Sequence, residues 1–230
     1  NFKFIKHGFF GRNGGYSSGI FESLNVGVDK GDDPHNVLKN REKVANYFGV
    51  TAQELVIPKQ VHGNIAQVID CVNEVECDAL ITNTQNLLIG INTADCCPVL
   101  LCSPLKKYIS AIHCGWRGAL AGIIENTMKE LQSLGCYDIV GAIGPCIQQK
   151  SYEIGDEIMN KVHSKYIRNR HFDLPLYVYD KLLECGAKDI SKIDVDTFTN
   201  KAYFSYRRQA AGNGAVKCGV QFSGITIVGE

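Results

Sequence analysis

The sequence has no excess of either charge. Lysine plus arginine and aspartate plus glutamate both total 24, so the formal net charge at pH 7 is zero. Proteins that hold a nucleic-acid backbone carry a basic surface, and this composition provides no domain-wide positive field. We therefore expect no polymeric nucleic acid among the partners.

Long apolar runs are also missing. No stretch approaches the roughly 20 residues that cross a bilayer, and the opening NFKFIKHGFF lacks the apolar core of a secretion signal. We expect a cytoplasmic protein without a membrane partner, although the chain starts at Asn1 rather than at a methionine. No repeat, low-complexity tract or linker is present, so we expect one domain over residues 1–230. A monomer is our expectation for the oligomeric state, which the sequence does not determine.

Closely spaced cysteine pairs of the CxxC kind are absent, although the chain has 10 cysteines. Structural zinc sites usually use such pairs, so a metal site here has to collect its ligands from distant segments. The chain is also much longer than a disulfide-stapled secreted module. Most of the cysteines are therefore expected to be small buried hydrophobic residues, as Cys102 in PVLLCS would be.

The apolar pattern that is present predicts an α+β fold with mixed sheets. The glycine-rich segment GFFGRNGGYSSGIFESLNVG predicts a loop. Apolar spacing predicts helices and strands in the following order: a helix at 35–50, strands at 55–63, 64–72, 78–83, 87–96, 97–103 and 108–115, a helix at 116–135, a strand at 139–145, helices at 156–167 and 174–186, and a strand at 216–228. Because several strands precede the main helix without regular alternation, we expect no doubly wound fold.

A hairpin in CCPVLLCSPLKKYISAIHCGWRG is the most informative local feature. A turn centred between Pro104 and Leu105 places Cys96 opposite His113, with about 5 Å between their Cβ atoms. A slip of one residue would pair Cys97 with His113 instead. The separation suits two ligands of one metal, or a nucleophile and its base.

A third metal ligand and an anion site can also be suggested from the residues. A catalytic zinc keeps three protein ligands and leaves the fourth position for water or substrate, and His62 in PKQVHG is the candidate, although a surface turn histidine fits the same pattern. Free N–H groups at the start of the Trp116 helix, together with Arg117, favour an anion such as phosphate, although Arg117 also fits an ordinary solvated residue. Cys146 in GPCI either lines the site or is buried.

The motifs PKQVHG, TADCCPVLL, HCGWRG, GPCI and SYEIG, with GGYSSGIFESLNVG and GDDPHNVLKNRE nearer the start, resemble the YfiH-like family of polyphenol oxidase or laccase-domain proteins. The resemblance extends from about His7 to Arg208. It implies an α/β/β/α sandwich with mixed β-sheets and a zinc ion bound by His62, Cys96 and His113.

The resemblance also implies an activity. Family members are phosphorylases of adenosine, inosine, guanosine and methylthioadenosine, with adenosine deamination as a second reaction, so purine nucleosides and phosphate are the implied partners. Arg12, Ser23 and Asn25 match the N-terminal motif and are implied to help hold nucleoside or phosphate.

The chain departs from the family pattern at several positions. Cys97 stands where an aliphatic residue is usual, and Cys114 stands in place of alanine. The segment QAAGNGAVK from Gln209 does not match the usual glycine-rich run, which puts substrate preference in doubt.

Other functional hypotheses remain open on the sequence. A metal-free cysteine hydrolase would use Cys96 as nucleophile and His113 as base. A copper oxidase using Cu2+ is less favoured, because only two of the six histidines lie in the metal motifs and neither Met128 nor Met159 lies in one to act as axial ligand. A binding or cell-wall quality-control protein without enzymatic activity is a further hypothesis.

Overall fold

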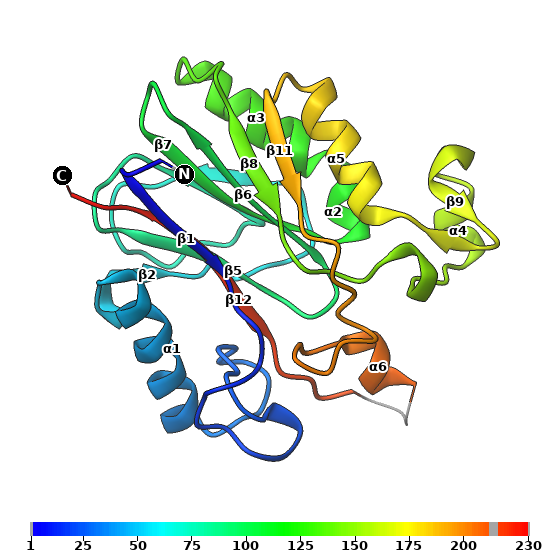
Figure 1. Ribbon diagram of the computed structural model, residues 1–230, viewed down its shortest axis with the longest axis horizontal. Helices are drawn as coiled ribbons and strands as arrows, with labels where there is room; N and C mark the ends of the chain where they lie inside the picture. The colour runs from blue at the N-terminus through cyan, green and yellow to red at the C-terminus, as the bar shows by residue number, and fades with distance from the viewer. Residues whose placement is uncertain (1, 212–215, 230) are drawn as a thin grey trace.

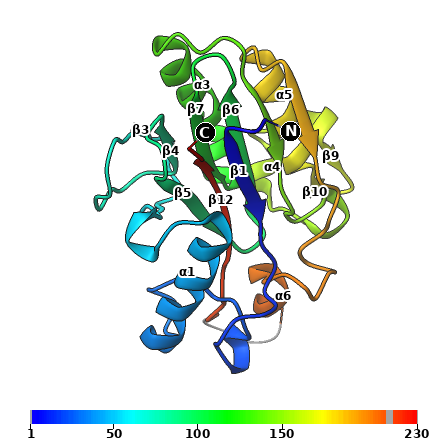
Figure 2. The same ribbon diagram turned by 60° about the vertical axis from the view of Figure 1, so that its left-hand side comes forward.

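The computed structural model describes residues 2–211 and 216–229. Two β-sheets lie face to face, and helices cover the outer side of each sheet (Figures 1 and 2). The α/β/β/α sandwich with mixed sheets is therefore confirmed.

The smaller sheet contains the chain's first and last described strands. Its order is β1 (Ile5–Phe9), β12 (Gln221–Ile227), β5 (Leu88–Thr93) and β2 (Leu55–Val56). The first two pairings are antiparallel and the third is parallel. Strand β1 was not predicted from the sequence.

The larger sheet contains the predicted hairpin at its centre. Its order is β11 (Asp189–Lys192), β8 (Val140–Ile143), β6 (Cys97–Ser103), β7 (Tyr108–Cys114), β4 (Ala79–Thr82) and β3 (Ala66–Val68). The two outermost pairings are parallel and the inner ones antiparallel. A separate short pair, β9 (Ile167–Arg168) with β10 (His171–Phe172), lies near helix α4 (Asp156–Met159).

Alternating side chains divide the interior into three hydrophobic layers. Between the sheets, Ile89 and Ile91 of β5 pack with Leu100 and Ile109 of the hairpin. The neighbouring residues on the same strands point outward, where helices cover them, and this burial of both faces explains the nearly continuous apolar runs in the sequence.

Helix α1 (Pro34–Phe48) covers the smaller sheet. It begins where the Asp33 carboxylate accepts a hydrogen bond from the His35 N–H, and it ends at Gly49 with φ 83°. The predicted helix over 35–50 is confirmed.

The larger sheet is covered by α2 (Trp116–Ala121), α3 (Ile123–Ser133) and α5 (Leu174–Glu184). The prediction of one helix over 116–135 was wrong, because Gly122 takes φ 92° and separates α2 from α3. The predicted helix over 156–167 is also shorter, with only α4 and a single 3-10 turn formed there. The apolar spacing in that segment arises because two separate turns pack on one core.

The hairpin register differs from the predicted one by two residues. His113 pairs with Pro98, and Cys97 pairs with Cys114, so Cys96 is not directly opposite His113. The turn is longer than assumed, because Lys107 takes a left-handed conformation (φ 55°) and the Asp138 carboxylate accepts the Leu105 N–H at 2.6 Å. A shift of two residues leaves every side chain on its expected face.

The N-terminal loop is fixed by one buried amide. The Asn40 side chain of α1 donates to Ser17 Oγ and to the carbonyl oxygens of Ser23 and Asn25, and it accepts the Tyr16 N–H. Asn40 is fully buried, and its bonds to Ser17 and Asn25 are buried as well, so these two partners would lose their bond without access to water.

We expect Asn40→Ala to lower the free energy of unfolding by about 2 kcal/mol or more, because several buried polar groups lose their partner. Asn46→Ala, at an exposed position on the same helix, is the control and should change it by less than about 0.5 kcal/mol. Urea unfolding followed by circular dichroism measures both. Equal stabilities of the two variants would contradict this account of the loop.

Candidate metal centre

Three side chains from separate segments converge at one end of the sandwich. One ligand atom each from His62, Cys96 and His113 lies within 4.8 Å of the other two. His62 comes from the loop between β2 and β3, Cys96 from the turn between β5 and β6, and His113 from β7. Burial increases from exposed His62 through half-buried Cys96 to buried His113, so one side of the cluster faces solvent.

The Asp78 carboxylate holds two of these residues at once. One of its oxygens lies 2.8 Å from His113 Nδ1 and also accepts the His62 N–H at 3.0 Å. The other oxygen accepts the N–H groups of Val61 and Gly63. A carboxylate at Nδ1 fixes the orientation of the ring and leaves Nε2 for a metal, as is usual behind metal-binding histidines.

The turn that carries His62 is anchored on its other side by Gln60. The Gln60 side chain donates to the Asn92 carbonyl at 2.8 Å and accepts the Asn92 N–H at 2.7 Å, which joins the turn to β5. His62 itself adopts φ 59°, a conformation that costs free energy in a residue other than glycine. Contacts from Gln60 and Asp78 therefore maintain this unusual backbone.

The turn that carries Cys96 is anchored through its neighbour, Asp95. Asp95 adopts φ 87°, and its buried carboxylate accepts hydrogen bonds from Thr197 Oγ1, Ser205 Oγ and the Arg207 N–H. The carboxylate thus joins the Cys96 turn to the C-terminal segment and takes no place among the three ligand atoms.

The two adjacent cysteines experience opposite electrostatic effects. Burial raises the pKa of Cys96, but the charge and hydrogen bonds of His113 and His62 outweigh it and bring the pKa to about 6. The pKa of His113 is raised, since Cys96 and Asp78 together outweigh the lowering by burial. By contrast, burial raises the pKa of Cys97 and of Cys114. Cys96 is therefore the thiol that ionises near neutral pH.

Gly115 leaves room for an ion between the donors. A Cβ atom at Gly115 would lie 3.1 Å from Cys96 Sγ, 3.3 Å from His62 Cδ2 and 3.9 Å from His113 Cε1. The space beside the donors is thus kept free of side-chain atoms by this glycine. Two imidazoles and a thiolate form a donor set that suits zinc. The residues present therefore fit a metal ion.

Arg12, Ser23 and Asn25 lie in the N-terminal loop, where their observed partners are other protein groups. Asn25 is fully buried and bonds to Asp32, Gly27 and Val220 through its side chain. Ser23 Oγ accepts the Gly15 N–H and donates to the Arg12 carbonyl.

The Arg12 guanidinium lies 4.6 Å from the centre of the Phe204 ring and donates to the Glu22 carbonyl. No contact in the described part of the chain joins Arg12, Ser23 or Asn25 to the three candidate ligands. Their role in substrate binding stays a prediction.

Arg117 and Cys146 have different environments. Arg117 is exposed at the start of α2 and lies 4.4 Å over the ring of Trp116. Helix α2 ends at Ala121, so the long helix dipole expected from a helix over 116–135 is lost. Binding of an anion at the start of α2 would therefore depend on side chains. Cys146 is fully buried in the layer between the larger sheet and its helices.

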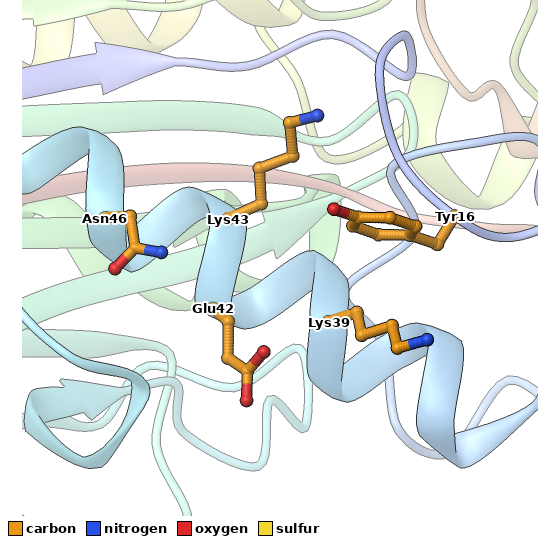
Figure 3. Close-up of a pocket in the computed structure, with 5 residues that line it drawn as sticks. All are labelled: Tyr16, Lys39, Glu42, Lys43 and Asn46. Carbon is orange, nitrogen blue, oxygen red and sulfur yellow. The ribbon is translucent and has the colours of Figure 1, made fainter.

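A separate pocket lies on α1 (Figure 3). Tyr16 lies beside the helix there, with Lys39 and Lys43 near its ring at 5.7 and 5.5 Å, and Glu42 and Asn46 also line the pocket. None of these residues belongs to the His62, Cys96 and His113 cluster.

Sequence reasoning missed Asp78, Asp95 and Gln60 as supports of the site. Asp78 gave a local signal, because it is a carboxylate placed directly before the buried strand β4. A charged group in such a place requires partners. Its partners lie 15 to 35 positions away, so the sequence does not identify them.

The fold and the cluster together define the class of this protein as an α/β/β/α sandwich with a histidine–cysteine–histidine centre that could hold a metal. The chain belongs to the family described as multi-copper polyphenol oxidoreductase laccase, whose model it matches over residues 6–227. This confirms the family that the motifs indicated.

Relatives and a solved structure agree with this assignment. Proteins named purine nucleoside phosphorylase are 36% identical in Rickettsia conorii, over 76% of this chain and 78% of the relative, and 32% identical in Deinococcus radiodurans, over 91% and 86%. The crystal structure of YlmD from Geobacillus stearothermophilus is 26% identical and has a TM-score of 0.90, and the match covers 99% of this chain and 93% of the YlmD chain.

Among the described residues, none of the helices has both the length and the apolar character that crossing a membrane requires.

We expect Asp78→Asn to weaken metal binding by about 10- to 100-fold, because an amide cannot accept all the N–H groups that orient His113 and the His62 turn. Asp189→Asn, at an exposed position in β11, should leave affinity unchanged. Titration of purified protein with a competing chelator measures both. Equal affinity in the two variants would show that Asp78 does not support the centre.

We expect Cys96→Ala to lose bound metal and Cys97→Ala to retain it, because the Cys97 side chain packs in the layer on the helix side of the larger sheet. Metal content per chain after dialysis, measured by atomic absorption, distinguishes them. Loss of metal only in Cys97→Ala would reverse the assignment of the ligand.

Proposed function

We propose that this protein is a zinc-dependent purine nucleoside phosphorylase acting on adenosine, inosine, guanosine and methylthioadenosine, with adenosine deamination as a second reaction. The observation that carries the proposal is the convergence of His62, Cys96 and His113 in a chain whose relatives bear the phosphorylase name. The open side at His62 lets a small molecule reach the cluster.

The positions of the methionines and of the other histidines favour zinc over copper. A single blue-copper site would add a weak axial ligand, often methionine, to two histidines and a cysteine. Met128 is buried in α3 within the helix-covered layer, and Met159 packs against the same layer. The other four histidines lie in β1, at the start of α1, before the turn at 164–166 and in β10, so they offer no second cluster in the described residues.

The chain's own residues would prepare the reaction by orientation and charge. Asp78 keeps the His113 ring fixed, and Gly115 leaves space beside the donors. A zinc ion bound there would supply Lewis-acid chemistry to the group at its open coordination position. The rigid turns at His62 and Cys96 reduce the reorganisation needed when substrate binds.

Phosphorolysis balances without another reactant. A phosphate oxygen forms a bond to the anomeric carbon of the sugar while the bond from that carbon to the purine nitrogen breaks. The electron pair passes to the purine, which takes up a proton that phosphate gives up, and the products are free base and sugar 1-phosphate. In deamination, water replaces the amino group of adenosine and the products are inosine and ammonia.

The substrate-binding residues suggested by the sequence divide into two groups. Arg117 stays in the proposal, because it is exposed and lies at the start of α2, just after the strand that carries His113. Arg12 stays as well, because its guanidinium lies over the ring of Phe204, and the next residue, Ser205, donates a hydrogen bond to Asp95. For Ser23, Asn25 and Cys146 the observed contacts stabilise the loop or the core, and their part in substrate binding stays a prediction.

A metal-free cysteine hydrolase is the second candidate. The lowered pKa of Cys96 and its contact with His113 favour it, since such a pair provides a nucleophile and a base. This reading gives His62 no role as a ligand.

Purified protein is expected to hold about one zinc per chain and to convert inosine and phosphate into hypoxanthine and ribose 1-phosphate. Products are measured by chromatography with inosine and with adenosine, each with and without phosphate, and ammonia is measured with adenosine. His62→Ala should abolish both reactions, whereas His35→Ala, at the start of α1, should keep them. Turnover that survives complete removal of metal would support the cysteine hydrolase instead.

A further inference from the structure

A tyrosine and two arginines come from segments that adjoin the candidate metal centre and are not among its candidate ligands. Tyr152 follows the 3-10 turn Gln149–Ser151 and is half-buried. Its ring is stacked on Phe172, with ring centres 6.0 Å apart and an interplanar angle of 29°. Among the described residues its hydroxyl group has no hydrogen-bond partner.

Arg207 is held next to this ring and next to the Cys96 turn. Its backbone N–H donates to the Asp95 carboxylate at 2.7 Å, and Asp95 is the residue before Cys96. Its guanidinium lies 5.3 Å from the centre of the Tyr152 ring and donates through Nη2 to the Glu153 carbonyl at 2.9 Å. The backbone bond fixes the position of Arg207, and the side chain keeps most of its donors free.

Arg117 brings a second positive charge to the surroundings of the centre, because it lies two residues after Gly115, where a Cβ atom would lie 3.1 Å from Cys96 Sγ. It follows His113 by four residues, and in the described residues no carboxylate forms an ion pair with Arg117 or with Arg207. The neighbouring Arg208 differs, because its guanidinium is used by the carbonyl oxygens of Thr197, Phe198 and Tyr203.

The electrostatic environment of Tyr152 is consistent with positive charges on this side of the centre. Burial and the negative charge of Cys96 raise the pKa of Tyr152, while the positive charges of Arg207 and Arg117 lower it. The net direction is upward, so the hydroxyl keeps its proton at neutral pH and can donate it to an acceptor.

We infer that Arg117, Arg207 and Tyr152 form the binding subsite for inorganic phosphate, next to the metal centre. Two guanidinium groups without carboxylate partners provide paired N–H donors that match the oxygens of a phosphate, and the tyrosine hydroxyl adds a third donor. A neutral purine would not compensate these charges, so phosphate fits better than base. The inference rests on the proposed phosphorolysis.

The test measures inorganic phosphate binding to zinc-loaded protein by isothermal titration calorimetry, without nucleoside. We expect Arg207→Gln and Arg117→Gln each to raise the Kd for phosphate about tenfold or more, since each removes a charged pair of donors. Tyr152→Phe should raise it less. Arg168→Gln, which removes an exposed guanidinium in β9, is the control and should leave it unchanged.

Kinetics separates phosphate from nucleoside binding. The KM for phosphate should rise in the two arginine variants while the KM for inosine and the zinc content stay within about twofold of the wild type. Arg207→Lys keeps the charge and the backbone bond to Asp95, so it should recover part of the affinity and excludes misfolding as the cause.

The outcomes distinguish the inference from the proposed function. Unchanged phosphate affinity in both arginine variants, a rise only in the KM for inosine, or no phosphate binding by the wild type would each overturn the subsite. Wild-type protein that binds phosphate through these residues but forms no sugar phosphate would overturn the phosphorolysis and keep the subsite.

Discussion

The hydrogen bonds of the Asp78 carboxylate are the interaction on which the candidate centre depends. Asp78 is fully buried, and it bonds at once to the ring of His113 and to three consecutive backbone N–H groups around His62. Burying a carboxylate costs several kcal/mol unless it is fully bonded, so these partners must stay in place for the charge to be tolerated. The requirement acts in both directions, because His62 adopts an unfavourable backbone conformation that these bonds, together with those of Gln60, stabilise. The Asp78 carboxylate thus has its buried charge compensated by hydrogen bonds, and the same bonds position His62 and His113.

Strand geometry decides which of two adjacent cysteines can take part. In β6 and β7 successive side chains point alternately toward the smaller sheet and toward the helices. Cys97 and Cys114 point to the helix side, where burial raises their pKa, and Cys96 lies in the turn beside the imidazoles. The two departures from the family pattern at Cys97 and Cys114 therefore lie in the buried layer and leave the donor set unchanged.

The sequence predicted the central hairpin, α1, α5 and the positions of most strands along the chain, because their apolar periodicity and caps are local properties. It also predicted the convergence of His62, Cys96 and His113, although their service as ligands stays a prediction. What it could not predict depends on contacts between distant segments. Strand β1 has few apolar residues of its own and forms by pairing with β12, and the bonds of Asp95 join residues more than 100 positions apart. The register error at the hairpin has a different cause, since Asp138 from outside the turn sets the conformation of Leu105.

The hydrogen bonds of Asp95 also affect the order in which the molecule can be completed during biosynthesis. Its partners lie 102, 110 and 112 positions later in the chain, so they leave the ribosome after the central hairpin has been made. Until they arrive, the backbone next to Cys96 lacks the contacts that stabilise its left-handed conformation. Closing so large a loop also carries an entropic cost and makes folding slow. The thiol of Cys96 consequently reaches its final geometry only after the segment from Thr197 to Arg207 has been synthesised.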